Sequence, residues 1–283
     1  MTHQVPFRRS LRIAIFRGLL GIARVNKFST IARVKKLLGI VLLCCSYAIG
    51  AIAQQKITVA VAANMQYTIE AIKTRYHLTD PTEISVVVGS SGQLAQQILH
   101  GAPFDIFISA DTSFPQRIAQ ASLAVAPPRV YAQGVLVLWS VRKDILPKPD
   151  MALLMAPGIT HIAIANPVTA PYGSAAQYIL KKYNIYDAVA AKLVTGESIT
   201  QTSQFIATGA ADIGFTAKSI VISDAMKGKG VWVELNRNDY PPIEQAAVLI
   251  RQPVANPAAA RFYDFLFSAK SKAIYQQFGY LVQ

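Results

Sequence analysis

The chain has 283 residues, with 28 Lys or Arg against 15 Asp or Glu and a formal net charge of +13. Nine of the basic residues lie in the first 53 positions, which hold no acidic residue, so the remainder carries 19 basic and 15 acidic residues, or about +4. This mild, scattered charge excludes a nucleic-acid-binding surface. Both cysteines, Cys44 and Cys45, also lie in the first part, which excludes disulfides in the remainder.

The first predicted element is an N-terminal signal peptide over residues 1–53. Residues 37–52 are uncharged, but the run is shorter than the roughly 20 residues that cross a bilayer as a helix. Ala51-Ile52-Ala53 has the small-x-small pattern of a signal-peptidase site, so we expect cleavage before Gln54 and a periplasmic protein. Because signal peptides usually have about 15–30 residues, we expect the true translation start near Val34. An uncleaved membrane anchor and an organelle transit peptide are the alternatives.

The residues after the leader predict alternating strands and helices. Each predicted strand is an apolar run, and each following helix starts at a polar turn. In chain order we expect a strand at 56–62, a turn at 63–65, a helix at 66–76, a strand at 83–88, a helix after Ser90 and a strand at 104–109. This β-α-β-α-β order predicts a parallel sheet with right-handed crossovers.

The second half of the chain repeats this order. We expect a strand at 161–165, a turn at 166–173 with a helix to about Tyr183, a helix after Ser198 and a strand at 212–216. Strands at 135–140 and 244–250 would join the halves as a hinge, and a helix at 259–268 would pack back on the first half. The predicted fold is therefore α/β with two lobes, each a mostly parallel sheet flanked by helices. Lobe 1 would hold residues 54–134 and 247–283, and lobe 2 residues 135–246.

One short pattern occurs twice, with a spacing of 108 residues. Ser90-Ser91-Gly92-Gln93 leads to Gly101 and Asp105, while Ser198-Ile199-Thr200-Gln201 leads to Gly209 and Asp212. A turn that begins a helix presents free backbone N–H groups and the positive end of the helix dipole. Two such turns that face each other would bind a small anion. The alternative is that Ser90 and Ser198 are ordinary helix N-caps.

The residue types in these turns indicate the kind of anion. The candidate donors are the Asn64 side chain, the Ser91 hydroxyl and the backbone N–H groups of Tyr172 and Ile199. The turns at 63–64, 89–92, 171–173 and 198–200 contain no Asp or Glu. Phosphate, which keeps a proton near neutral pH, needs an acceptor, whereas a fully ionised dianion needs donors only. We therefore expect a deprotonated tetrahedral dianion.

Enzyme chemistry has little support in the sequence. The four histidines have no metal-ligand spacing. Gly89-Ser90-Ser91-Gly92 differs from the Gly-x-Ser-x-Gly elbow of hydrolases, and Ser140-x-x-Lys143 lacks the partner motif of penicillin-binding enzymes. We predict a protein without catalytic activity, without a cofactor and without a directly bound metal.

Five segments together resemble the periplasmic molybdate-binding proteins of ABC transporters. They are Val59–Asn64, Gly89–Gly92, Gly101–Asp111, Asn166-Pro167 with Ala170–Gly173, and Gly209–Phe215. The resemblance extends over about residues 56–283. It implies a two-lobed class II periplasmic binding protein, a monomer that closes on molybdate or tungstate and delivers it to a membrane permease.

The resemblance also implies a set of oxyanion-binding residues. These are Asn64 with Ala63 beside it, Ser91, Tyr172 and Ile199, and molybdenum would be bound only as molybdate through them. Some members of the family have a threonine where Ala63 stands and a tyrosine where Ala217 stands. The alternatives are a sulfate or other oxyanion receptor of the same fold, an enzyme on a related two-lobed fold, and a secreted module that senses the anion.

Overall fold

The computed structural model describes residues 56–145 and 150–282, and residues 54–283 form one compact unit. The predicted signal peptide and both cysteines lie outside the described residues. The strands are β1 (Lys56–Ala62), β2 (Glu83–Gly89), β3 (Ile106–Ile108), β4 (Arg129–Gly134), β5 (Leu136–Ser140), β6 (Ile162–Ala165), β7 (Leu193–Gly196), β8 (Ile213–Ala217), β9 (Val231–Glu234) and β10 (Ile243–Leu249). The α-helices are α2 (Gln66–His77), α3 (Ser91–Leu99), α4 (Ser113–Gln120), α5 (Pro171–Lys182), α6 (Tyr186–Val189), α7 (Ile199–Ala207), α8 (Lys218–Val221), α9 (Pro257–Phe265) and α10 (Ala269–Gln277), and the 3₁₀ turns are η1 (Ala63–Met65), η2 (Met151–Met155), η3 (Ala190–Lys192) and η4 (Arg237–Asp239).

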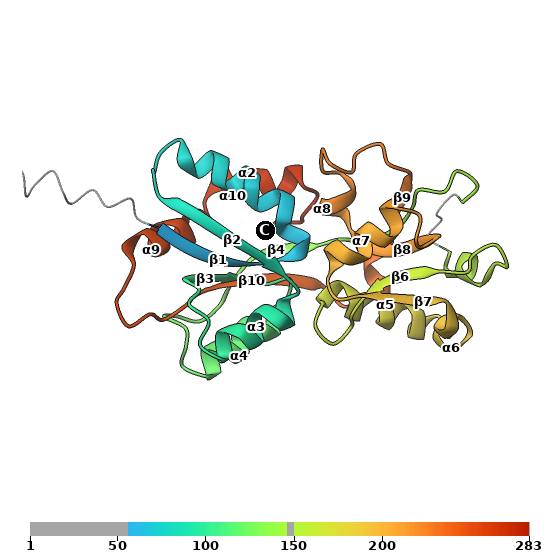
Figure 1. Ribbon diagram of the computed structural model, residues 1–283, viewed down its shortest axis with the longest axis horizontal. Coiled ribbons are helices and arrows are strands. Elements are labelled where there is room, and N and C mark those ends of the chain that lie inside the picture. The colour runs from blue at the N-terminus through green and yellow to red at the C-terminus, as the bar shows by residue number, and fades with distance from the viewer. Residues whose placement is uncertain (1–55, 146–149, 283) are drawn as a thin grey trace, which may run out of the picture. The chain divides into compact units, whose positions relative to one another are not determined.

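The strands form two five-stranded sheets with equivalent orders, β2-β1-β3-β10-β4 and β7-β6-β8-β5-β9. In each sheet the first three strands are parallel, and the fourth is antiparallel to both of its neighbours. This confirms the predicted α/β fold with two mostly parallel sheets. We call the first sheet with its helices the first lobe, and the second sheet with its helices the second lobe (Figure 1).

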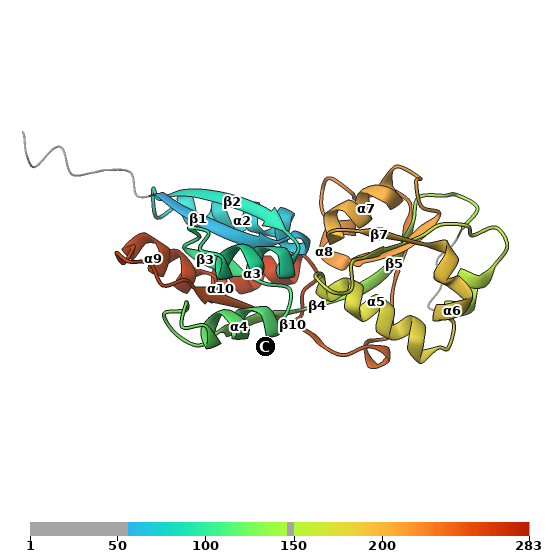
Figure 2. The same ribbon diagram turned by 60° about the horizontal axis from the view of Figure 1, so that its bottom comes forward.

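Helices cover both faces of each sheet because the strand side chains alternate in direction. Ile57, Val59 and Val61 of β1 pack with α2, α9 and α10, whereas Ala60 packs with α3 and α4 on the other face. In the second sheet, α5 packs on one face and α7 on the other. Figure 2 shows α3 and α4 on the same side of the first sheet. Both sheets are therefore buried on two faces, as parallel sheets usually are.

The chain passes between the lobes twice. β4 leads into β5 through Val135 alone, and η4 leads back to β10 through residues 240–242. All seven residues of β10 belong to the first sheet, and the predicted boundary at residue 246 lies within this strand. The division of the chain into lobes at particular residues stays a prediction.

Most of the predicted elements agree with the structure to within two residues at each end. The predicted tail helix at 259–268 is wrong in extent, because α9 ends at Phe265 and Ser268 then caps a second helix, α10. Among the described residues, no helix is both long and apolar enough to cross a membrane.

Candidate functional site

A small cavity of about 10 Å³ lies where four strand-to-helix turns meet. Its lining includes all five predicted site residues: Ala63, Asn64, Ser91, Tyr172 and Ile199. Ala63 and Asn64 follow β1, and Ser91 follows β2 at the start of α3. Tyr172 and Ile199 lie at the starts of α5 and α7 in the second lobe. The remaining lining residues are Ala62, Ser90, Ala110, Ala170 and Pro171.

The Ser91 turn holds a hydroxyl group in a fixed position. Ser90 is the N-cap of α3, and its Oγ accepts a hydrogen bond from the Gln93 amide at 3.4 Å. Ser91 is 1 % exposed, and its Oγ accepts from the Ala110 N–H at 3.0 Å. Because this contact occupies an acceptor position, the Ser91 hydroxyl keeps its hydrogen to donate elsewhere.

Tyr172 and Ile199 each contribute a backbone N–H at the start of a helix. Pro171 is the first residue of α5, and Ser198 caps α7 by accepting from the Gln201 amide at 3.3 Å. In the described part of the chain, neither the Tyr172 nor the Ile199 amide has a hydrogen-bond acceptor. The first amides of a helix have no partner within it, and the helix dipole makes them attractive to an anion.

The Asn64 side chain was expected to donate to the anion, but its amide hydrogens are bonded elsewhere. Its Nδ2 donates to Gln245 Oε1 at 2.9 Å and to Tyr280 OH at 3.0 Å, so both side-chain hydrogens are used away from the cavity. Its carbonyl oxygen accepts from Ser219 Oγ at 2.8 Å. The donor of Asn64 that remains available is therefore its backbone N–H, which has no acceptor within residues 56–145 or 150–282.

The cavity carries no charged side chain in its lining. Tyr172 is its only titratable residue, and burial raises the pKa of this hydroxyl well above its usual range, so the ring stays neutral. An anion in this cavity would meet amide and hydroxyl donors without the cost of desolvating a lysine or arginine.

Direct contacts between the lobes surround the cavity. The Gly92 N–H donates to the Thr169 carbonyl at 2.8 Å, and Thr200 Oγ1 donates to Gln66 Oε1 at 2.8 Å. The space at Gly92 is small, because a Cβ there would lie 2.9 Å from Thr169 Cα. These contacts hold the cavity in a closed arrangement of the two lobes.

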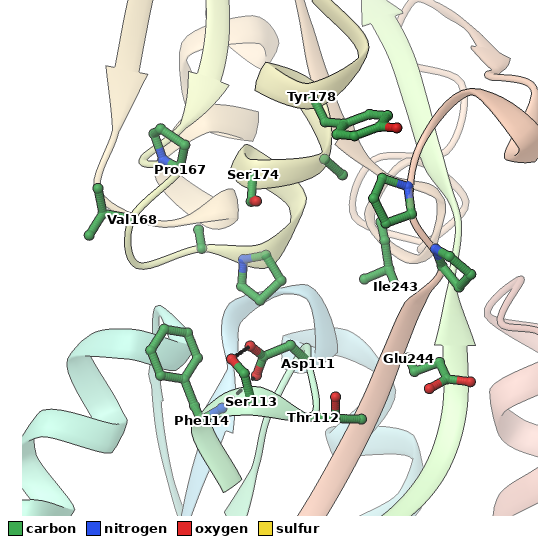
Figure 3. A pocket seen from close by; sticks show the side chains of 15 residues that line it. Asp111, Thr112, Ser113, Phe114, Pro167, Val168, Ser174, Tyr178, Ile243 and Glu244 are labelled. Carbon is green, nitrogen blue, oxygen red and sulfur yellow. Dashed lines mark hydrogen bonds between the residues drawn. The ribbon is translucent and has the colours of Figure 1, made fainter. Parts of the chain in front are cut away.

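A larger groove of about 330 Å³ lies beside the cavity and shares Ala170 and Pro171 with it. Figure 3 shows Asp111, Ser113 and Phe114 on one side of this groove and Pro167, Ser174 and Tyr178 on the other. Its lining includes the carboxylates of Asp111 and Glu244 and no basic residue. These two carboxylates would repel an anion, so the small cavity at the four turns is the better anion site.

The Ser-x-x-Lys match does not present a free serine hydroxyl. Ser140 of the Ser-x-x-Lys match is buried, and its hydroxyl donates to the Asp212 carbonyl at 2.6 Å. Among the residues that the structure describes, no group of three His, Cys, Asp or Glu side chains could hold a metal ion.

Sequence reasoning missed two residues behind the cavity, Gln245 and Tyr280. Both are buried and bind the Asn64 side chain. A signal existed for Gln245, because it is an amide directly before the apolar run 246–250 of a predicted strand. No local signal identified Tyr280. Ala217 does not line the cavity. Some members of the family that the sequence resembles have a tyrosine at this position.

Comparisons with known proteins agree on one family. The sequence pattern of the bacterial extracellular solute-binding proteins matches residues 57–281. The molybdate-binding protein ModA of Azotobacter vinelandii is 35 % identical over 255 residues, which cover 90 % of this chain and 99 % of that protein. The ModA protein of Rhodobacter capsulatus is 36 % identical over 232 residues, or 82 % of this chain and 90 % of that one. The solved structure of the periplasmic molybdate-binding protein of A. vinelandii superposes with a TM-score of 0.76 at 32 % identity, covering 80 % of this chain and 99 % of that one.

Proposed function

The chain belongs to the bacterial extracellular solute-binding proteins, among relatives that bind molybdate, and from this premise we propose that it captures molybdate for an ABC transporter. It acts as a receptor outside the cytoplasm and not as an enzyme. The ligand is cargo, and no cofactor takes part.

One observation carries the proposal: the residues that line the small cavity between the lobes offer neutral hydrogen-bond donors and no charged group. The proposed donors are the Ser91 hydroxyl and the backbone N–H groups of Asn64, Tyr172 and Ile199, with Ala63 in van der Waals contact. A hydrogen bond to a charged group contributes about 1.5–3 kcal/mol each, so four donors suffice for tight binding of a dianion. Three of the four are backbone N–H groups in the first turn of a helix or of a 3₁₀ turn, where the partial positive charge of unpaired amides favours an anion.

We extend the proposal to the second oxyanion, the oligomeric state and the location of the protein. Tungstate, which has the same charge and tetrahedral shape as molybdate, binds at the same site. The protein acts as a monomer in the periplasm after removal of residues 1–53, and it presents the closed lobes to a membrane permease.

Calorimetric titration of the purified protein with molybdate, tungstate, sulfate and phosphate tests this function. We expect one site per chain, comparable binding of molybdate and tungstate, and weaker binding of sulfate because of its smaller frame. We expect phosphate to bind more weakly than molybdate, because the cavity lining has no carboxylate to accept its proton. Tighter binding of sulfate than of molybdate would make the protein a sulfate receptor and refute the proposal.

A further inference from the structure

Gln245 lies at the centre of a buried hydrogen-bond network behind the cavity. The side chain is fully buried in β10. Its Oε1 accepts from Asn64 Nδ2 at 2.9 Å and from Tyr131 OH at 2.7 Å, and its Nε2 donates to Tyr172 OH at 3.0 Å. One carboxamide therefore contacts two residues that line the cavity.

These two residues belong to different lobes. Asn64 follows β1 of the first lobe, whereas Tyr172 lies in the first turn of α5 in the second lobe. The hydrogen bond between Gln245 Nε2 and Tyr172 OH is thus a contact between lobes, while the bond to Asn64 lies within the first lobe. Through Gln245, the position of one donor turn depends on the position of the other.

The backbone around Gln245 is shaped for this contact. The pairing of β10 with β4 shifts register, because Gln245 pairs with Ala132 and Ala246 with Val130. Tyr131 therefore has no residue opposite it in the register with β10. Such bulges redirect side chains. At Gly134, the last residue of β4, a Cβ would lie only 2.1 Å from Tyr172 OH and 2.4 Å from Gln245 Nε2. The Tyr172 hydroxyl therefore occupies space that any residue other than glycine at position 134 would fill.

We propose that Gln245 is a positioning residue that stabilises the closed arrangement of the lobes by holding the Asn64 turn and the Tyr172 hydroxyl together. It does not touch the anion. The idea rests on the proposed function only in that oxyanion binding is coupled to closure. When the lobes separate, water replaces the partner of Gln245 Nε2, whereas loss of the Tyr172 hydroxyl in the closed state leaves this donor buried and unpaired.

The main test is Tyr172→Phe, which removes the hydroxyl and keeps the backbone N–H. An unpaired buried donor costs enough to weaken molybdate binding by roughly 5- to 150-fold. We expect this loss to appear mainly as faster dissociation. Gln245→Met, which keeps the length of the side chain but removes its polar atoms, should also weaken binding.

Tyr275→Phe is the matched control. Tyr275 is as buried as Tyr172, but its hydroxyl donates to the Leu266 carbonyl at 2.9 Å within the first lobe. This change should lower the melting temperature without anion and leave molybdate affinity unchanged. Tyr172→Phe should show the opposite pattern, with the melting temperature of the free protein retained and its rise on adding molybdate reduced. A purely structural role for the Tyr172 hydroxyl would lower both melting temperatures equally and overturn the proposal.

A distance measurement separates this proposal from the proposed function. Spin labels at the exposed positions Gln97 of α3 and Gln204 of α7, introduced as cysteines after Cys44→Ser and Cys45→Ser, report the separation of the lobes. We expect Tyr172→Phe to reduce the fraction of molecules with a short distance between the labels, compared with labelled protein that keeps Tyr172. This reduction should appear with or without molybdate. Failure of the unmutated protein to bind any oxyanion would refute the function alone, because the ligand-free distances still test the contact. Identical distance distributions together with identical affinities would refute the role of Gln245.

Discussion

Gly92→Ala is the sharpest test of whether the lobes close on the anion as the structure describes. Gly92 lies in the first turn of α3, and its N–H donates to the Thr169 carbonyl of the other lobe at 2.8 Å. An added Cβ would lie 2.9 Å from Thr169 Cα and 3.1 Å from Thr169 Cβ. It would also lie 2.9 Å from Phe114 Cζ, the far end of a side chain that can rotate away. The closed lobes must therefore separate at this point.

The expected loss of affinity follows from two contributions. Overpacking at a tight contact costs about 1–3 kcal/mol, and loss of one neutral hydrogen bond costs about 0.5–1.5 kcal/mol. Together they weaken molybdate binding by roughly 10- to 2,000-fold. The open protein should respond in the opposite direction, because replacing a helical glycine with alanine stabilises a helix by up to about 1 kcal/mol.

Two measurements on the same variant test this reasoning: calorimetric titration with molybdate, and urea unfolding without anion. Gly158→Ala is the matched control, because a Cβ at Gly158 would meet no atom within 4 Å. Unchanged molybdate affinity in Gly92→Ala would show that the lobes do not approach each other at Thr169 in the bound state. A parallel loss of affinity and of unfolding free energy would instead indicate damage to the fold.

Three further predictions concern the cavity and the stability of the fold. Ser91→Ala should weaken molybdate binding by about 1.5–3 kcal/mol, the contribution of one hydrogen bond to a charged group; Ser174→Ala, in the groove of Figure 3, should leave titration results unchanged, and the reverse outcome would move the site to that groove. Molybdate affinity should be constant from about pH 6 to about pH 9, because the only titratable residue lining the cavity is Tyr172, whose pKa burial raises well above its usual range; a titration step in that range would mean that an ionisable group contacts the anion. Burial tends to raise the pKa of Asp212, but hydrogen bonds from two backbone amides and the Arg142 guanidinium outweigh it and hold this pKa below its usual range. A lowered pKa in the folded state stabilises the fold above the ordinary value, so the free energy of unfolding should fall as the pH drops below about 4, and Asp212→Asn should flatten this dependence in acid unfolding curves.

The elements that sequence reasoning predicted well are those specified by local patterns. β1 was predicted over the residues that it occupies, because a fully buried parallel strand is a continuous apolar run. Ser90 and Ser198 were predicted to begin helices, and each caps the expected one, because an N-cap acts within three residues of itself. The positions of the four turns follow from these elements.

The features that the sequence did not reveal depend on distant partners. The edge strands β4 and β9 were not predicted, since each is partly exposed and lacks a strong apolar pattern. The orientation of the Asn64 side chain depends on Gln245 and Tyr280, which lie 181 and 216 positions further along the chain. No sequence pattern around Asn64 could indicate that its side-chain amide donates hydrogen bonds to Gln245 and Tyr280.

The strand order of the two sheets has a consequence for how the protein assembles. All five strands of the second sheet follow one another in the chain, from β5 to β9, so its strand pairings need no strand from elsewhere in the described residues. In the first sheet, β4 lies at the edge beside β10, the last of the described strands, and its Gln133 also bridges to Leu281 near the C-terminus. Pairings between such distant segments form slowly. The first sheet can therefore be complete only after β10 has been synthesised, and β4 has no neighbouring strand to pair with in that sheet until then.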